Sequence, residues 1–314
     1  MMADGTLTPV LMDVDTGVDD AMALALAWAA PQIELVGVTT VAGNVTLDQA
    51  TTNTLRVLNT IGATDLPVYR GMSRPLVRDH FDAAHFHGND GLGGALFPDR
   101  ERSVEAMTAP EFIVQSARNY QGSLTLCFVG PLTNLAVALS LEPDLPDMVD
   151  HVVVMGGAFQ MPGNATATAE FNIAVDPEAA EQVARSALAV VWIGLDVTHS
   201  TNLYREDWDL IDDSATGGPK VVREVCRQAF EARFADLMHL HDPLAVGVLQ
   251  DPSLIVGVDL PVTVDTSVRQ TAGTTRMMLD ESTHTNQLVA VEVDAARFRE
   301  LFGSVLGIPL SDRE

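Results

Sequence analysis

Four aspartates fall within eight positions near the start of the chain: Asp13, Asp15, Asp19 and Asp20 in the stretch VLMDVDTGVDDAMALALAWAA, residues 10–30. Two like charges about 4 Å apart repel by roughly 4 kcal/mol at an effective dielectric constant of about 20. A helix N-terminus returns only about 0.3 to 1 kcal/mol per charge. The cluster therefore predicts a bound cation. Carboxylate oxygens without thiolates favour Ca²⁺ or Mg²⁺ over zinc.

A strand and a helix must hold these carboxylates. Apolar residues around Asp13 predict a buried strand over residues 10–14, and the two-residue period places Asp13 and Asp15 on one face at its carboxyl end. Gly17 permits a sharp turn. Asp19 and Asp20 then fall in the first turn of an apolar helix, where free backbone N–H groups favour negative charge.

Strand-like and helix-like segments alternate along the rest of the chain. The predicted strands are 34–44, 66–71, 123–130, 151–157 and 187–198, and the predicted helices are 46–61, 110–120 and 134–141. Each strand ends in Gly, Asp, Asn or Thr. This pattern predicts a single α/β domain over residues 1–314, with a Rossmann-like, mostly parallel open sheet flanked by helices. In such sheets the site lies beyond the carboxyl ends of the strands.

The last third of the chain is less regular. Residues 205–240 predict helices with a break at 212–219, and a further helix follows the proline of His241-Asp242-Pro243. The segments 258–267, 273–280 and 286–294 predict strands that are antiparallel and peripheral.

Composition excludes several classes of partner. The net charge is −25, with 18 Lys+Arg against 43 Asp+Glu, so basic patches for nucleic acid or an anionic membrane are not expected. The acidity is interpreted as a solvated surface. The longest apolar stretch, residues 21–30, is too short to span a membrane, and no secretion signal is recognisable, so a cytoplasmic protein is expected. Cys127 and Cys226 are interpreted as inert thiols.

Residues 78–97 form a segment rich in His, Asp and Gly with no sustained period, which predicts a long functional loop. It carries His80, His85 and His87. Zinc binding by this trio is not favoured because no cysteine accompanies it.

Three further stretches also place polar groups at the ends of apolar segments: VAGN at 41–44, GNATATAEFNIAVDPEAA at 163–180 and HDP at 241–243. Together with DVDTGVDDA, they resemble the nucleoside hydrolase family, the inosine-uridine preferring N-ribohydrolases that cleave nucleosides into base and ribose. The resemblance covers essentially the whole chain. The aspartate cluster and EFNIAVDPEAA are specific in combination, whereas HDP alone is a weak signal.

The resemblance implies a Ca²⁺ ion at the bottom of a ribose pocket. Its implied ligands are the side chains of Asp15, Asp20 and Asp242 and the backbone carbonyl of Val129. This set consists of hard oxygens, in agreement with the aspartate cluster. Asp15 would also be the general base for the metal-bound water. Asp13 is expected to support the ligands rather than to bind the metal.

The resemblance also implies the contacts to the ribonucleoside. Asp19 and Asn172 are expected on the 2′ and 3′ hydroxyls with Asn44 nearby, and Asn164 and Glu170 on the 5′ side. Met155 and Phe171 would line the pocket, although both are also compatible with an ordinary core.

His241 is expected to protonate the departing base, because negative charge develops there and a donor of near-neutral pKa suits it. His87 is a weaker candidate for base contact. The remaining candidates over the base are Phe230, Arg233 and Phe234, while His151, His199, His239 and His284 are left structural or unassigned. The preferred base is not readable from the sequence.

Two alternatives remain open here. DVDTG also resembles the opening motif of haloacid-dehalogenase-type phosphatases, but the single lysine, Lys220, lies in a helical region away from any strand end. A non-catalytic nucleoside or sugar sensor on the same fold should lose one of the site residues, and none is lost. The family resemblance implies a homodimer or homotetramer.

Overall fold

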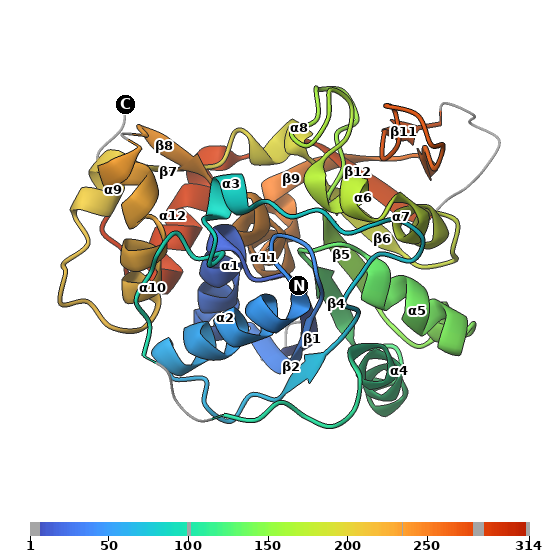
Figure 1. Cartoon of the computed structure of the whole chain (residues 1–314), viewed down its shortest axis with the longest axis horizontal. Helices are drawn as coiled ribbons and strands as arrows, with labels where there is room; N and C mark the ends of the chain where they lie inside the picture. Colours follow the sequence, from blue (N-terminus) through green and yellow to red (C-terminus); the bar gives the residue numbers. More distant parts are fainter. Residues whose placement is uncertain (1–6, 99–101, 234, 279–285, 312–314) are drawn as a thin grey trace.

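The computed structural model describes residues 7–98, 102–233, 235–278 and 286–311. A central eight-stranded sheet has the order β3-β2-β1-β4-β5-β6-β12-β9 (Figure 1). Its strands are β1 Thr8–Val14, β2 Ile33–Thr40, β3 Val68–Arg70, β4 Thr125–Phe128, β5 His151–Met155, β6 Val190–Ile193, β9 Ile255–Asp259 and β12 Gln287–Val293. Neighbouring strands are parallel except for β9, which runs antiparallel to β12 at the edge. The predicted mostly parallel α/β sheet is confirmed.

Helices cover both faces of the sheet (Figure 1). One layer contains α1 Val18–Ala29, α2 Leu47–Thr60, α10 Gly217–Val225, α11 His241–Gln250 and α12 Ala295–Leu306, and the other contains α4 Ala109–Tyr120, α5 Thr133–Leu141 and α7 Pro177–Ala184. Alternation along β1 separates two cores: Val10 and Met12 join the α1 side, and Leu11 joins the α5 side. All three side chains are fully buried.

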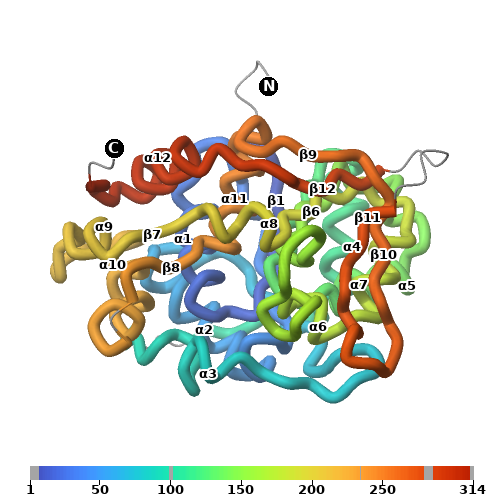
Figure 2. Tube along the Cα trace, turned by 90° about the horizontal axis from the view of Figure 1, so that it is seen from above, coloured from blue at the N-terminus to red at the C-terminus, as the bar shows by residue number. Residues whose placement is uncertain are grey.

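Short elements surround the carboxyl edge of the sheet and its flanks (Figure 2). The short helices are α3 Ala84–His87, α6 Phe171–Val175, α8 Leu195–Thr198 and α9 Arg205–Asp209, with single turns at η1 Leu145–Asp147, η2 Gln228–Ala232 and η3 Pro252–Leu254. Two antiparallel ribbons pair β7 Asn202–Tyr204 with β8 Leu237–His239, and β10 Val262–Val264 with β11 Thr275–Met277.

The structure corrects the expectation for the last third of the chain. Strand β12 is not peripheral, because it lies inside the central sheet and pairs in parallel with β6. Only β9 and the β10–β11 ribbon are antiparallel as expected. Residues 205–240 are not wholly helical, since they include β8, and the second predicted strand ends at Thr40 rather than at residue 44. Phe234 and His284 lie outside the described residues.

Within the part of the chain that the structure describes, no helix combines the length and the apolar character that crossing a membrane requires.

Candidate active site

A cavity of about 360 Å³ opens beyond the carboxyl ends of β1, β4 and β5. It is lined by Asp19, Asn44, Phe81, Asp82, Ala83, His85, Phe86, His87, Val129, Met155, Asn164, Ala165, Glu170, Phe171, Asn172, His199, His239, His241 and Asp242. Most of the residues predicted from the sequence are therefore brought together in one cavity, although they span more than 200 positions (Asp19 to Asp242).

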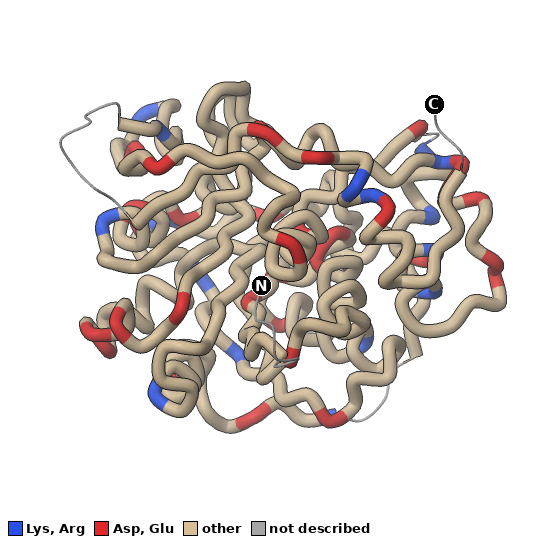
Figure 3. The backbone as a smooth tube through the Cα atoms, turned by 180° about the vertical axis from the view of Figure 1, so that it is seen from behind, with Lys and Arg blue, Asp and Glu red and all other residues tan. Residues whose placement is uncertain are grey.

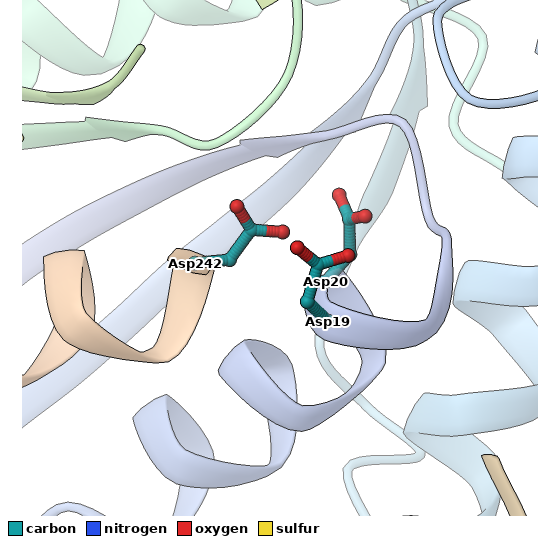
Figure 4. A group of neighbouring side chains, drawn as sticks. All are labelled: Asp19, Asp20 and Asp242. Carbon is teal, nitrogen blue, oxygen red and sulfur yellow. The ribbon is translucent and has the colours of Figure 1, made fainter. Parts of the chain in front are cut away.

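The floor of the cavity is acidic because two helix starts meet there. Asp19 and Asp20 lie in the first turn of α1, and Asp242 lies in the first turn of α11 and points toward them (Figure 4). Oxygen atoms of these three carboxylates lie within 4.8 Å of one another. Asp20 is held rigidly, since its Oδ1 accepts from the backbone N–H of Asp15 at 3.0 Å and its Oδ2 accepts from Gly17 at 2.8 Å.

Asp15 follows the end of β1 and is fully buried. Its Oδ2 accepts the backbone N–H of Asn44 at 2.6 Å, whereas its Oδ1 has no hydrogen-bond partner. Burial, followed by the negative charge of Asp20, raises the pKa of Asp15 well above its ordinary value. The backbone passes so close that a Cβ at Gly43 would lie 2.0 Å from Asp15 Oδ2. Glycine is therefore required at position 43.

These carboxylates fit a hard cation. The buried Oδ1 atoms of both Asp15 and Asp19 lack partners, and an unpaired buried charge is costly. Burial and the charges of Asp19, Asp20 and Asp15 also raise the pKa of Asp242 well above its ordinary value. A divalent cation would relieve both effects, and oxygen-only donors suit Ca²⁺ or Mg²⁺. The grouping differs from the predicted ligand set in two respects, because Asp19 joins Asp20 and Asp242 in the tight cluster and Asp15 does not belong to it.

Asp13 is held by side chains that lie outside the cavity lining. Its Oδ2 accepts from Thr39 Oγ1 at 2.6 Å and from Asn134 Nδ2 at 2.6 Å, and it does not line the cavity. Burial raises its pKa to about 7, against the opposing effect of those two hydrogen bonds. In the phosphatase alternative, Asp13 would be the nucleophile, but its side chain is fully buried and does not line the cavity. Lys220 is on α10, pairs with Glu224 and does not line the cavity.

The first turn of α6 forms the opposite wall. Glu170 is the N-cap of α6 and accepts from the backbone N–H groups of Asn172 at 2.9 Å and Gly157 at 3.2 Å. Burial raises its pKa to about 7 although these bonds favour the ionised form. Asn172 Nδ2 donates to the carbonyls of Val129 at 2.8 Å and Met155 at 3.1 Å, so one amide joins the ends of β4 and β5.

Asn164 and Asn44 complete the polar lining. Asn164 Oδ1 accepts from the N–H of Phe171 at 2.8 Å, which fixes the loop before α6. Asn44 donates through its Nδ2 to Asp20 Oδ2 at 3.1 Å. Met155 and Phe171 both line the cavity, and the Phe171 ring meets Phe81 edge-on at 5.6 Å.

His87 on α3 closes the side above Asp19. Its Nδ1 accepts the backbone N–H of Val18 at 3.1 Å and lies 3.9 Å from Asp19 Oδ1. Burial lowers the pKa of His87 to about 4, so its ring is neutral. The three loop histidines have different surroundings, because His80 Nε2 lies 2.8 Å from the Gly43 carbonyl whereas His85 and His87 line the cavity. Among the described residues, the aspartates are the group with metal-binding spacing.

His241 lies beside Asp242 with its Nδ1 2.7 Å from Thr198 Oγ1. Burial, followed by the neighbouring histidines, lowers its pKa to about 3. The expected near-neutral pKa is therefore wrong for this geometry. A neutral imidazole can still donate one N–H.

Sequence reasoning missed two histidines of the cavity wall. His199 and His239 both line the cavity, with rings stacked at 4.7 Å, and each lies within 5.6 Å of the His241 ring. His239 Nδ1 lies 2.8 Å from Asn202 Oδ1, its partner in the β7–β8 register. The spacing His239-Leu240-His241 was the available signal, since a two-residue period directs alternate residues of an extended segment to one side.

The loop residues Phe81, Asp82, Ala83 and Phe86 also line the cavity and were not singled out from the sequence. Of the suggested base contacts, Phe230 is fully buried against Trp208 at 5.3 Å and is a core residue. Arg233 does not line this cavity. It donates to the backbone carbonyls of Phe86 at 2.9 Å and His85 at 3.3 Å.

An open, mostly parallel sheet with a cluster of carboxylates at its carboxyl edge, beside a cavity rich in asparagine and carboxylate groups, fits the class of metal-binding enzymes that act on polyhydroxylated substrates. Residues 10–300 match the family model described as inosine-uridine preferring nucleoside hydrolase. The chain belongs to this family, whose members are metal-dependent enzymes that hydrolyse the N-glycosidic bond of ribonucleosides.

Individual relatives agree with this family assignment. The chain is 37% identical to a pyrimidine-specific ribonucleoside hydrolase, RihA, of Citrobacter koseri, over 95% of this chain and 97% of the relative. It is similar in structure to a purine-preferring ribonucleoside hydrolase from Gardnerella vaginalis, with a TM-score of 0.88, 34% identity and coverage of 95% and 98%. A plant nucleoside hydrolase gives a TM-score of 0.89 at 30% identity, with coverage of 96% and 99%.

Proposed function

We propose that this chain hydrolyses ribonucleosides at the cavity built around Asp15, Asp19, Asp20 and Asp242. The observation that carries this proposal is the cluster of Asp19, Asp20 and Asp242, two of which line the cavity, with the buried Oδ1 atoms of Asp19 and of the neighbouring Asp15 left without a partner. These carboxylates offer acceptors to a cation, a water and a hydroxyl group.

Ca²⁺ is the proposed ion, held by Asp15, Asp20, Asp242 and the Val129 carbonyl. When bound, it would neutralise the carboxylates, orient the ribose diol and lower the pKa of a nearby water. Asp19 lies in a tight cluster with Asp20 and Asp242. We propose that its carboxylate contacts both the ion and a ribose hydroxyl.

Asp15 is the proposed general base. Its Oδ2 is fixed by the Asn44 N–H, which leaves Oδ1 as the atom that accepts the proton of the attacking water. A neighbouring cation would counter the repulsion that raises the pKa of Asp15 and so keep the carboxylate ionised.

The ribose is proposed to lie between Asp19 and the first turn of α6. Asn172, Asn164 and Glu170 offer polar atoms there, and Asn172 is fixed to both β4 and β5. An unpaired buried polar group costs about 1 to 3 kcal/mol, so a sugar with several hydroxyls requires this many partners.

His241 is proposed to donate a hydrogen bond to the departing base. Negative charge grows on the base in the oxocarbenium-like transition state, and a positioned donor stabilises that charge. His87 lies near Asp19 on the same side of the cavity. The relatives include both a pyrimidine-specific and a purine-preferring enzyme, so the base is not assigned. A cytoplasmic location and a homodimer or homotetramer stay predictions.

The test is a panel of purine and pyrimidine ribonucleosides and their 2′-deoxy analogues, assayed for released sugar. We expect ribose release from at least one ribonucleoside and at least 100-fold lower kcat/KM for its 2′-deoxy analogue. Absence of ribose release from every member, with a correctly folded protein, would refute the proposal.

A further inference from the structure

A second, smaller cavity of about 170 Å³ lies beside the active-site cavity. We refer to it as the side chamber. It is lined by Val18, Phe86, Gly93, Val225, Gln228, Ala229, Arg233, Ala235, Leu237, Met238 and His239. Most of these side chains are apolar. No step of the proposed hydrolysis uses it.

The side chamber is adjacent to one end of the active-site cavity. The residues shared by the two cavities are Phe86 and His239. Neither belongs to the ribose wall, which is formed by Asp19, Asn172 and Glu170. Phe86 is on the loop helix α3, and His239 lies with His199 and His241 in the wall of the cavity where the base is proposed to lie. A group that enters the side chamber would therefore be attached to the base and not to the sugar.

Arg233 lines the chamber. Its guanidinium donates to the carbonyls of Phe86 and His85, so it connects α3 to the turn η2. Its charge is thereby engaged by backbone carbonyls, and most of the other lining side chains, among them Val18, Val225 and Ala229, are apolar. An interior of this kind favours an alkyl or aryl group over a polar one.

We infer that the side chamber is a subsite for an apolar substituent on the nucleobase, so the substrate class includes ribonucleosides with alkylated bases. This inference rests on the proposed function. An apolar protein cavity of about 150 Å³ is known to hold benzene, so a substituent of about six carbon atoms is the expected upper limit. Each methylene buried there should lower KM about fourfold.

The experiment compares two homologous series with the wild-type enzyme, 5-alkyl uridines and N6-alkyl adenosines, from hydrogen through methyl and propyl to hexyl and decyl. In at least one series, KM should fall as the chain lengthens toward six carbons and rise beyond that. If ribose is released from uridine or adenosine but the first methyl lowers kcat/KM at least 100-fold in both series, or if KM does not fall with length in either, the subsite is refuted while the hydrolase function stands. If no parent ribonucleoside is cleaved, the proposed function itself fails.

Ala229→Phe fills the chamber from η2, and Ala232→Phe is its matched control. Ala232 is exposed on the same turn and lines neither cavity. Ala229→Phe should lower the ratio of kcat/KM for the propyl compound to that for its parent at least tenfold, while Ala232→Phe should leave this ratio within twofold of wild type. Ala229→Leu, a milder change, should give a smaller decrease of the same sign if the Phe variant does not fold. An unchanged ratio in a folded Ala229 variant overturns the inference.

Discussion

Asp15 has one carboxylate oxygen fixed by the N–H of Asn44 and one with no partner in a fully buried position. That asymmetry distinguishes it from Asp20, whose oxygens both accept backbone N–H groups. Asp13 shares the asymmetry, since its Oδ1 is also buried without a partner while its Oδ2 accepts from Thr39 and Asn134. At the residue scale, Asp15 is set apart from Asp13 by its place beside Asp20, to which its backbone N–H donates.

Asp15→Asn tests the general base. The amide cannot accept the proton of the attacking water, so kcat with the best ribonucleoside should fall about 10² to 10⁴-fold. The melting temperature without added metal should not decrease, because the change removes one charge from a repelling cluster. Asp48→Asn is the control, since Asp48 is exposed and paired with Arg70. Near-wild-type kcat in the Asp15 variant would remove it as the base.

His241→Ala tests the donor to the leaving base. Inosine or uridine should be slowed at least tenfold more than a riboside with a good leaving group such as p-nitrophenolate, which needs no donor. His151→Ala is the matched control, because His151 lies at the opposite end of β5 and does not line the cavity. Equal slowing of both substrates by the His241 change would contradict its assignment.

At the element scale, the site depends on which strand and helix ends meet. Much of this could be predicted from the sequence, because the carboxylates of β1 and α1 are close along the chain and short polar motifs mark the ends of β2, β5 and α6. The wall formed by His199, His239 and His241 could be predicted only in part, because the two-residue spacing relates His239 to His241 but not to His199. The segment that carries His199 is brought beside them by the pairing of Asn202 with His239 across 37 positions, which no local pattern shows. The placement of β12 beside β6 is equally long-range, so its peripheral position was predicted wrongly.

Helix α12 offers an element-scale prediction about acid stability. Asp207 of α9 is fully buried and accepts from Arg299 of α12 and from Ser311. Burial alone would raise its pKa, but these hydrogen bonds outweigh burial and the pKa of Asp207 lies below its ordinary value. The stabilisation is therefore present above the unfolded pKa of about 3.9 and is lost as pH falls through the lower, folded pKa.

Arg299→Gln should lower the free energy of unfolding at pH 7 by about 3 to 5 kcal/mol, because a buried carboxylate loses its partner. The difference from wild type should shrink as pH falls toward 3.5, because Asp207 without its arginine takes up a proton at a higher pH than Asp207 in the folded wild type. Denaturant titrations at pH 7, 5 and 3.5 measure both. Arg297→Gln is the control, since Arg297 is half-exposed and pairs with Asp251 at the surface. A difference that does not change with pH would contradict the role of the Asp207 charge.

At the scale of the whole molecule, the net charge of −25 is the dominant feature. Asp and Glu are spread over the molecule, and Lys and Arg are fewer (Figure 3). Such an excess destabilises the compact state through self-repulsion. The Debye length falls from about 10 Å at 0.1 M salt to about 3 Å at 1 M, so salt should screen this repulsion.

The melting temperature should therefore rise on going from 0.05 to 1 M NaCl at constant metal concentration. For a domain of about 150 to 250 residues, a gain of about 1 kcal/mol in the free energy of unfolding raises the melting temperature by about 2 to 4 °C. A parallel series in sucrose is the control. Sucrose is uncharged, so it stabilises by exclusion from the protein surface without screening charge. Calorimetry gives the melting temperature in each series. A melting temperature that stays constant or falls in NaCl would show that surface repulsion does not limit stability.

The most direct test of the central claim is the rate of ribose release from the best ribonucleoside before chelation, after chelation and dialysis, and after addition of Ca²⁺. The aspartate cluster predicts that the rate falls at least 100-fold when the metal is removed and returns with micromolar to millimolar Ca²⁺, and that Asp242→Asn weakens this recovery. A metal-free protein that retains its full rate would contradict the account.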